Sequence, residues 1–188
     1  MNKKGFTLVE LLVMLVVLGV ISTIAIPNIM GILSETRINT MIDNANKMYD
    51  TLKIKETTKS SSFPKPTNTD TSIECVAIKL AKLGTADDYK PSIEGAEVNF
   101  NQSFIVAKKE VSGTDVKYKY YVRLIETKNS KNYGIELEEV NSLSKDSYKT
   151  NIDSITIPPT ATSLNELVST LGCTTVNYPA WHIFTIYM

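Results

Sequence analysis

Few side chains in this sequence could carry catalysis or hold a metal. The 188 residues include one histidine, His182, and two cysteines, Cys75 and Cys173. A single imidazole excludes any mechanism that needs two histidines. Two cysteines exclude both a four-cysteine zinc site and a disulfide-dense scaffold. The sequence also contains no phosphate-binding glycine loop, Cys-x-x-Cys motif or His-Glu-x-x-His motif.

An excess of charge is absent as well. Twenty Lys and Arg residues balance twenty Asp and Glu residues, so the formal net charge is zero. A protein that mainly coats nucleic acid needs excess positive charge, and this class is therefore disfavoured. We predict a non-enzymatic protein that holds no metal and no cofactor, and we do not expect nucleic acid to be its main partner.

The strongest feature that is present is an apolar run near the N-terminus. Leu11 to Leu33 is 23 residues without a charged side chain. As a helix this run would span about 35 Å, and the hydrocarbon core of a bilayer is about 30 Å thick. Lys3 and Lys4 precede the run, so the positive-inside rule places them in the cytoplasm and the rest of the chain outside. The apolar region of a signal peptide is usually shorter, so we predict that residues 6–33 are transmembrane.

One acidic residue stands at the start of this segment. A carboxylate such as that of Glu10 is costly in an apolar environment, so it is a functional candidate by default. A plain membrane anchor does not explain it. The alternative is that Glu10 lies at the membrane edge and is merely solvated.

The segment around Glu10 resembles a known processing site. The residues read Lys-Lys-Gly-Phe-Thr-Leu-Val-Glu-Leu-Leu from Lys3 to Leu12, which is similar to the class III leader junction of type IV pilins and pseudopilins. In that family a membrane-embedded peptidase cuts after the glycine and N-methylates the new terminal residue. The resemblance implies that residues 1–5 are a leader peptide, that the chain is cut between Gly5 and Phe6, and that Phe6 is methylated.

The resemblance also implies a role for Glu10 in assembly. Cleavage frees a positive amine at Phe6, and an opposite charge nearby offsets much of the cost of burying it. Between neighbouring subunits, the pair of Phe6 and Glu10 would set the axial register of a filament. The implied partners are identical or related pilin subunits, the prepilin peptidase and N-methyltransferase, and an assembly ATPase with its inner-membrane platform.

The helix is expected to continue beyond the apolar run. Apolar residues recur at three- and four-residue spacing, which is typical of an amphipathic helix: Ile38, Met41, Ile42, Ala45, Met48, Tyr49 and Leu52. We therefore predict one helix over residues 6–59, of which 34–59 pack on a head. Pro27 predicts a kink, because proline removes a helix hydrogen bond, and Gly19 is the second candidate. Alternatively, both residues reflect the composition of membrane helices.

Residues 60–188 are predicted to form an α+β head. Three segments rich in β-branched and aromatic residues predict an antiparallel meander: Val98–Lys108, Val116–Thr127 and Tyr133–Val140. Short helices are expected over Ile73–Leu83 and Ser163–Leu171, and further strands over 152–157 and 181–187. The sheet would bury one face on the apolar stripe of the helix. The predicted fold is thus a long kinked N-terminal helix packed on an antiparallel sheet.

Four features of the head could bear on function. Cys75 and Cys173 could form a disulfide outside the cytoplasm, or remain two buried thiols. Side chains alternate along one predicted strand, so three basic residues and one tyrosine share a face. This face could bind DNA phosphates and stack a base, or it could simply face water. Its residues are Lys117, Lys119, Tyr121 and Arg123. Glu136 and Glu138 are interpreted as a solvated sheet face. Nothing beside His182 suggests a nucleophile.

Together these features predict a structural subunit, a major or minor pilin of a type IV pilus. It would be a single-pass protein of the cytoplasmic membrane before assembly and part of an extracellular filament afterwards. One alternative is a pseudopilin of a secretion or DNA-uptake system. Another is an unprocessed, membrane-anchored extracellular binding protein.

Overall fold

The computed structural model describes residues 6–58, 74–112, 115–154, 168–173 and 175–177. The chain divides into two compact units, and the boundary between them in the sequence lies between Arg37 and Ile38. Each unit is described by itself.

The first unit contains the N-terminal part of helix α1 (Leu8–Thr58). Its described large apolar side chains are exposed, from 81% at Leu8 to 46% at Leu33. Gly19 and Pro27 both lie within α1, which is not interrupted at either position, and the predicted kink stays a prediction. Among the residues that the structure describes, no helix combines the length and the hydropathy that a membrane span requires.

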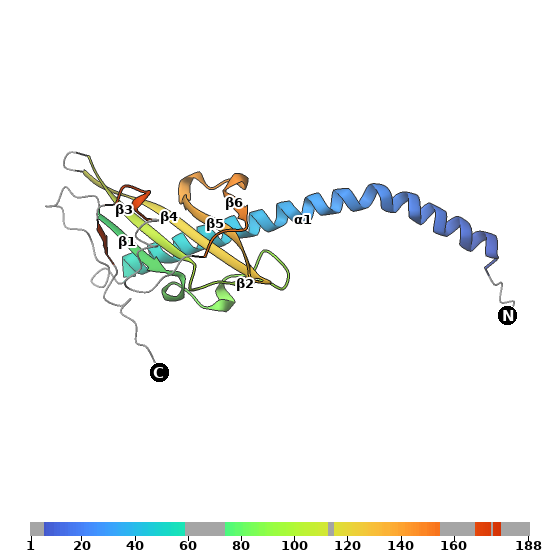
Figure 1. Cartoon of the computed structure of the whole chain (residues 1–188), viewed down its shortest axis with the longest axis horizontal. Coiled ribbons are helices and arrows are strands. Elements are labelled where there is room, and N and C mark those ends of the chain that lie inside the picture. Colours follow the sequence, from blue (N-terminus) through green and yellow to red (C-terminus); the bar gives the residue numbers. More distant parts are fainter. Residues whose placement is uncertain (1–5, 59–73, 113–114, 155–167, 174, 178–188) are drawn as a thin grey trace, which may run out of the picture. The chain divides into compact units, whose positions relative to one another are not determined.

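The second unit is an α+β head, in which the rest of α1 lies against a β-sheet (Figure 1). In the described part of the chain the strands are β1 (Glu74–Lys79), β2 (Glu97–Val98), β3 (Phe104–Ser112), β4 (Asp115–Lys128), β5 (Lys131–Glu139), β6 (Tyr148–Thr150) and β7 (Thr175–Asn177). Their order in the sheet is β6-β5-β4-β3-β1-β7, and β2 pairs with β4. Every pairing is antiparallel except that of β1 with β7, which is parallel.

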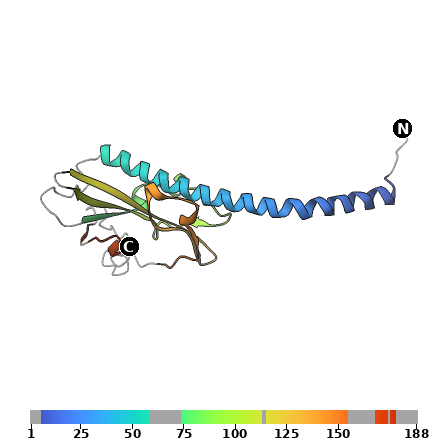
Figure 2. The same cartoon turned by 90° about the horizontal axis from the view of Figure 1, so that it is seen from above.

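Four short 3₁₀ helices connect the described strands: Leu80–Lys82, Ala86–Asp88, Val140–Ser142 and Lys145–Ser147. Helix α1 lies along one face of the sheet, and residues 168–173 lie against part of the other face (Figure 2). On one face, the side chains of Met41, Ala45, Met48 and Leu52 are fully buried. They pack in one cluster with residues of β1, β3, β4 and β5 that include Val76, Ile105, Val122 and Ile135. The apolar stripe predicted for the helix therefore faces the sheet, as expected.

The opposite face of the sheet carries a smaller cluster. Cys75, Ala77, Phe104 and Val106 pack there with Val168, and the half-buried Leu137 lies against them. Residues of β1 thus alternate between two buried faces, because Val76 and Ile78 belong to the cluster under α1. A strand buried on both faces stabilises two apolar layers at once.

The prediction of a helix over Ile73–Leu83 was wrong. The segment forms strand β1 and then the 3₁₀ helix Leu80–Lys82. A short apolar run that is buried on both sides has no periodicity that separates a strand from a helix. Of the predicted helix 163–171, residues 168–171 are described: Val168 and Ser169 are helical, and Thr170 and Leu171 form a turn. Ile152 to Ser154 form no strand. Residues 155–167 and 178–188 lie outside the described residues.

Candidate functional site

The start of α1 is closed by a reciprocal set of hydrogen bonds. The carboxylate oxygen Oε2 of Glu10 accepts from the backbone N–H and from the hydroxyl of Thr7, both at 2.8 Å. In return, the backbone N–H of Glu10 donates to Thr7 Oγ1 at 3.3 Å. The N–H of Leu11 donates to the carbonyl of Thr7 at 3.2 Å. This arrangement is a capping box, so Thr7 is the N-cap and the helix begins at Leu8.

Sequence reasoning singled out Glu10 but missed Thr7. The signal was present, because Thr7 and Glu10 have the Thr-x-x-Glu spacing of a capping box directly before an apolar run. Phe6 precedes the N-cap and is 74% exposed. Gly5, on the other side of the predicted cleavage bond, lies outside the described residues.

Comparison with known protein families identifies this segment. The family model described as "Prokaryotic N-terminal methylation motif" matches residues 1–26. The chain carries a prokaryotic N-terminal methylation motif. This motif is the class III leader of type IV pilins and pseudopilins, so the chain is similar to these proteins over that segment. No curated protein and no solved structure matches the chain.

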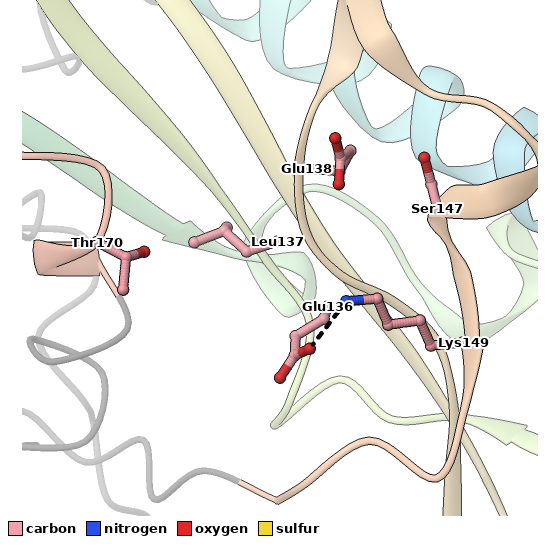
Figure 3. A pocket seen from close by; sticks show the side chains of 6 residues that line it. All are labelled: Glu136, Leu137, Glu138, Ser147, Lys149 and Thr170. Carbon is pink, nitrogen blue, oxygen red and sulfur yellow. Dashed lines mark hydrogen bonds and ion pairs between the residues drawn. The ribbon is translucent and has the colours of Figure 1, made fainter.

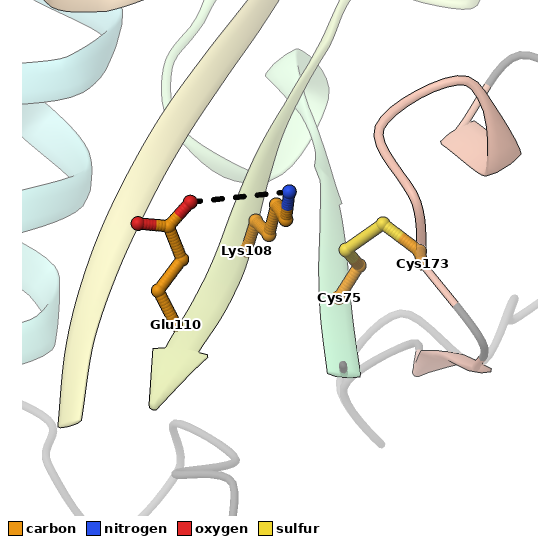
Figure 4. Close-up of a disulfide and its surroundings, with 4 residues drawn as sticks. All are labelled: Cys75, Lys108, Glu110 and Cys173. Carbon is orange, nitrogen blue, oxygen red and sulfur yellow. Dashed lines mark ion pairs between the residues drawn. A yellow bond between two sulfur atoms is a disulfide. The ribbon is translucent and has the colours of Figure 1, made fainter. Parts of the chain in front are cut away.

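The methylation motif covers residues 1–26 and says nothing about the function of the head. The described part of the head contains a disulfide. Cys75 and Cys173 form a disulfide with Cα atoms 5.8 Å apart, across a sequence separation of 98 residues (Figure 4). It joins Cys75, the second residue of β1, to Cys173, which directly follows the turn at residues 170–172. Cys75 is fully buried in the cluster on the sheet face opposite α1.

The basic face predicted on β4 is not formed as a patch. Lys117 is exposed, Tyr121 is half-buried and Arg123 is fully buried. The ammonium of Lys119 lies 3.3 Å from Glu110 Oε1, and Lys108 lies 3.9 Å from the same oxygen (Figure 4). The hydrogen bond to Glu110 raises the pKa of Lys119, and burial raises the pKa of Tyr121. A carboxylate therefore lies on the same face as the lysines, which argues against binding of nucleic-acid phosphates by this face.

Arg123 lies on the same side of β4 as Lys119 and Tyr121, as the alternation predicts, because the ladder between β3 and β4 is regular there. The register of the β4–β5 ladder shifts between Val122 and Leu124, and Arg123 lies opposite two residues of β5, Glu136 and Leu137. The extra residue of this bulge is in β5 and does not turn Arg123 to the other face. The predicted side of the strand was right, but the prediction that Arg123 faces water with Lys117 and Lys119 was wrong, because Arg123 is fully buried.

The guanidinium of Arg123 is held by three backbone carbonyls. Its Nε donates to Gln102 at 3.2 Å, Nη1 to Glu136 at 3.2 Å and Nη2 to Asp153 at 2.7 Å. The carboxylate of Glu136 lies 3.9 Å from Nη1. These contacts satisfy the buried charge, so Arg123 has a structural role.

A small open cleft lies at the outer edge of β5. It measures about 150 Å³ and is lined by Glu136, Leu137, Glu138, Ser147, Lys149 and Thr170 (Figure 3). Glu136 and Glu138, interpreted from the sequence as a solvated face, are therefore half-buried in this cleft. Within the described residues, no group of three or more His, Cys, Asp or Glu side chains is placed to hold a metal ion. His182 lies outside those residues.

Proposed function

We propose that this chain is a structural subunit, a major or minor pilin, of a type IV pilus. The observation that carries the proposal is the methylation motif over residues 1–26. The motif implies a precursor that is anchored in a membrane and a product that is assembled at the cell surface. In this proposal the chain is cut between Gly5 and Phe6, methylated at Phe6, and built into a filament without any catalysis of its own.

The surface of the first unit supports assembly through α1. Between Phe6 and Leu33 the described large apolar side chains are exposed, and a surface of this kind marks a site of contact with lipid or protein. We propose that lipid covers residues 6–33 before assembly and that helices of other subunits cover them in the filament. The amine freed at Phe6 then pairs with Glu10 of a neighbouring subunit and sets the register.

The proposed partners follow from this sequence of events. A prepilin peptidase and N-methyltransferase processes the precursor, and an ATPase with its membrane platform drives assembly. A pseudopilin of a secretion or DNA-uptake system would share the motif. High abundance in filaments sheared from cells supports the pilin, whereas a trace amount beside another major subunit supports the pseudopilin.

Mass spectrometry of filaments sheared from cells tests the proposal directly. We expect a mature chain that begins at Phe6 and carries one added methyl group on its terminal amine. A chain that keeps Met1, remains with the membrane fraction and forms no filament would contradict the proposal. That result would favour an unprocessed, membrane-anchored binding protein.

A further inference from the structure

The last described residues of the chain join the head at one end of the sheet. Residues 168–173 and 175–177 are called the C-terminal segment below. Within this segment, β7 pairs with β1 in parallel over three residue pairs, and β7 is the end strand in the order of the described strands. A parallel pair is slightly less stable per residue than an antiparallel pair. The pairing of β7 is therefore a weak attachment by itself.

The apolar contacts of the C-terminal segment lie on the face of the sheet opposite α1. Val168 is fully buried there in a cluster with residues of β1 and β3, and the half-buried Leu171 and Cys173 pack against this cluster. The larger cluster under α1 includes none of the described residues of the segment. The segment can therefore leave the sheet without disturbing the core between α1 and the sheet.

The disulfide holds the segment beside β1 (Figure 4). Cys173 bonds to Cys75 of β1 and precedes the start of β7, at Thr175, by two positions. The other covalent path from the described part of the head runs along the chain from Ser154, which Thr175 follows by 21 positions. The effective concentration of a tethered segment falls roughly as the −3/2 power of the tether length, so loss of the short tether lowers it about 30-fold.

A reductant reaches the bond from the side of Cys173. Cys75 is fully buried, whereas Cys173 is half-buried, and attack by a thiolate on a disulfide depends on access to the sulfur. A dithiol attacks Sγ of Cys173 and forms a mixed disulfide, and Sγ of Cys75 leaves and takes a proton. The second thiol of the reductant then releases Cys173 as a thiol. The reductant ends as a disulfide, so two electrons and two protons have moved to the protein.

We propose that the disulfide is a redox-sensitive lock on the C-terminal segment. When the bond is reduced, the segment opens from β1 as a unit of its own, while α1 and β1–β6 stay folded. Proteins open locally in units that have few buried apolar contacts, and the segment has its own small cluster. Opening uncovers Cys75 and the apolar residues of β1 and β3 that Val168 covers. The lock belongs to the head and does not depend on the proposed filament.

Native-state hydrogen exchange of the full chain in detergent micelles tests the lock. Exchange of the protected amides of β4, β5 and β7 is followed by NMR before and after complete reduction by dithiothreitol. We expect reduction to raise the exchange rates in β7 about 30-fold. In the reduced chain, low concentrations of urea should accelerate exchange in β4 and β5 but not in β7, because opening of a short segment exposes little new surface.

Alkylation of Cys75 gives a second readout that needs no substitution. In the reduced chain a buried thiol is protected from reagents, so Cys75 can react only while the segment is open. We expect iodoacetamide to modify Cys173 first, and Cys75 at a rate that low concentrations of urea do not change. Mass spectrometry of peptides from the alkylated chain measures both rates.

Two valines provide matched variants. Val168 belongs to the cluster under the C-terminal segment, whereas Val140 belongs to the cluster under α1. In the reduced chain, Val168→Ala should raise exchange in β7 about tenfold, because it removes buried methyl groups from the closed segment. Val140→Ala should raise exchange in β4 and β5 and leave exchange in β7 unchanged.

Three outcomes would overturn the proposal. Equal urea dependence of exchange in β7 and in β4 would show that the segment unfolds only with the whole head. Unchanged exchange in β7 after complete reduction would show that contacts other than the disulfide hold the segment. An equal response of β7 to Val140→Ala and Val168→Ala would show that the two clusters unfold together.

Discussion

The guanidinium of Arg123 donates to carbonyls of three separate segments of the head, at Gln102, Glu136 and Asp153. Gln102 precedes β3, Glu136 lies in β5, and Asp153 follows β6. One buried cation therefore fixes the positions of three segments relative to β4. Removal of the side chain would leave buried carbonyls without donors, and unsatisfied buried groups are costly.

We predict that Arg123→Ala lowers the free energy of unfolding of the head by about 3 kcal/mol. Lys117→Ala is the control, because Lys117 is exposed on the same strand, and it should change stability by less than about 0.5 kcal/mol. Denaturant titration of the full chain in detergent measures both values. Equal losses for the two variants would contradict the structural role of Arg123.

A second buried charge, Glu126, holds the segment before β2. Its carboxylate accepts from the backbone N–H of Ser92 at 2.6 Å and from the hydroxyl of Ser92 at 2.8 Å. Burial raises the pKa of Glu126, although the hydrogen bonds from Ser92 and from the backbone of Ile93 act in the opposite direction. Because the pKa is higher in the folded chain, protonation of Glu126 favours folding.

We predict that this contribution to stability is complete below the ordinary pKa of glutamate, about 4.3, and is lost as pH rises through the raised pKa. Glu126→Gln keeps an acceptor for Ser92 but cannot ionise. The stability of the wild type relative to this variant should therefore fall as the pH rises above about 4.3 and through the raised pKa. Unfolding titrations over that range measure it, and parallel pH profiles for the two proteins would count against the assignment.

At the scale of elements, the sequence predicts the helix that has one buried face, because its apolar residues recur with a visible period. It does not predict the strand whose type is decided by tertiary contacts on both of its faces. The stripe from Met41 to Leu52 has one buried face, so its 3.6-residue spacing is visible in the sequence and the packing on the sheet follows. β1 is buried on both faces, and its pattern therefore looks like a short helix.

The residues of the candidate sites also divide into those that the sequence pattern reveals and those that only tertiary contacts reveal. Glu10 stands out because it is the one acidic residue at the start of an apolar run, and the capping spacing from Thr7 could have been detected in the same way. Alternation correctly places Arg123 on the same side of β4 as Lys119. Its burial depends on contacts with the segments at Gln102, Glu136 and Asp153, which alternation along a single strand does not reveal.

The disulfide belongs to the scale of elements because it ties β1 to the turn at residues 170–173. The bridge closes a loop across 98 residues, and the chain-entropy model gives about 4.7 kcal/mol for loops of that length. We predict that replacing Cys75 and Cys173 together by serine lowers the free energy of unfolding by about 2–4 kcal/mol. Dithiothreitol should destabilise the wild type and leave the double variant unchanged; equal sensitivity would contradict the bond.

The two units of the molecule differ in whether their apolar side chains are buried. The head from Ile38 onward has its own buried core, whereas the apolar side chains of the first unit are exposed. Burial of apolar surface stabilises by about 25 cal/mol per Å². Contact with lipid or with helices of other chains would bury the described apolar side chains of the first unit and stabilise it, which is what the proposed filament core requires.

Glu10 connects this requirement to the methylation motif, because its carboxylate can serve two purposes. Oxygen Oε2 is occupied by the two donors of Thr7, and Oε1 accepts no hydrogen bond from the residues that the structure describes. The capping box needs the shape of the side chain, which glutamine also provides. Neutralisation of an amine at Phe6 needs the negative charge, which glutamine lacks.

We predict that Glu10→Gln keeps the start of α1 and the cleavage after Gly5 but reduces filament yield at least about tenfold, because the buried amine at Phe6 loses its counter-ion. Thr7→Val removes the cap, at a cost of about 1 kcal/mol, and keeps the charge, so it should retain more filament than Glu10→Gln. Thr7→Ser should match the wild type. Sheared filaments are quantified, and mass spectrometry of the N-terminus verifies that each variant is processed. If Glu10→Gln assembles normally while Thr7→Val does not, Glu10 acts through the capping box and not through its charge.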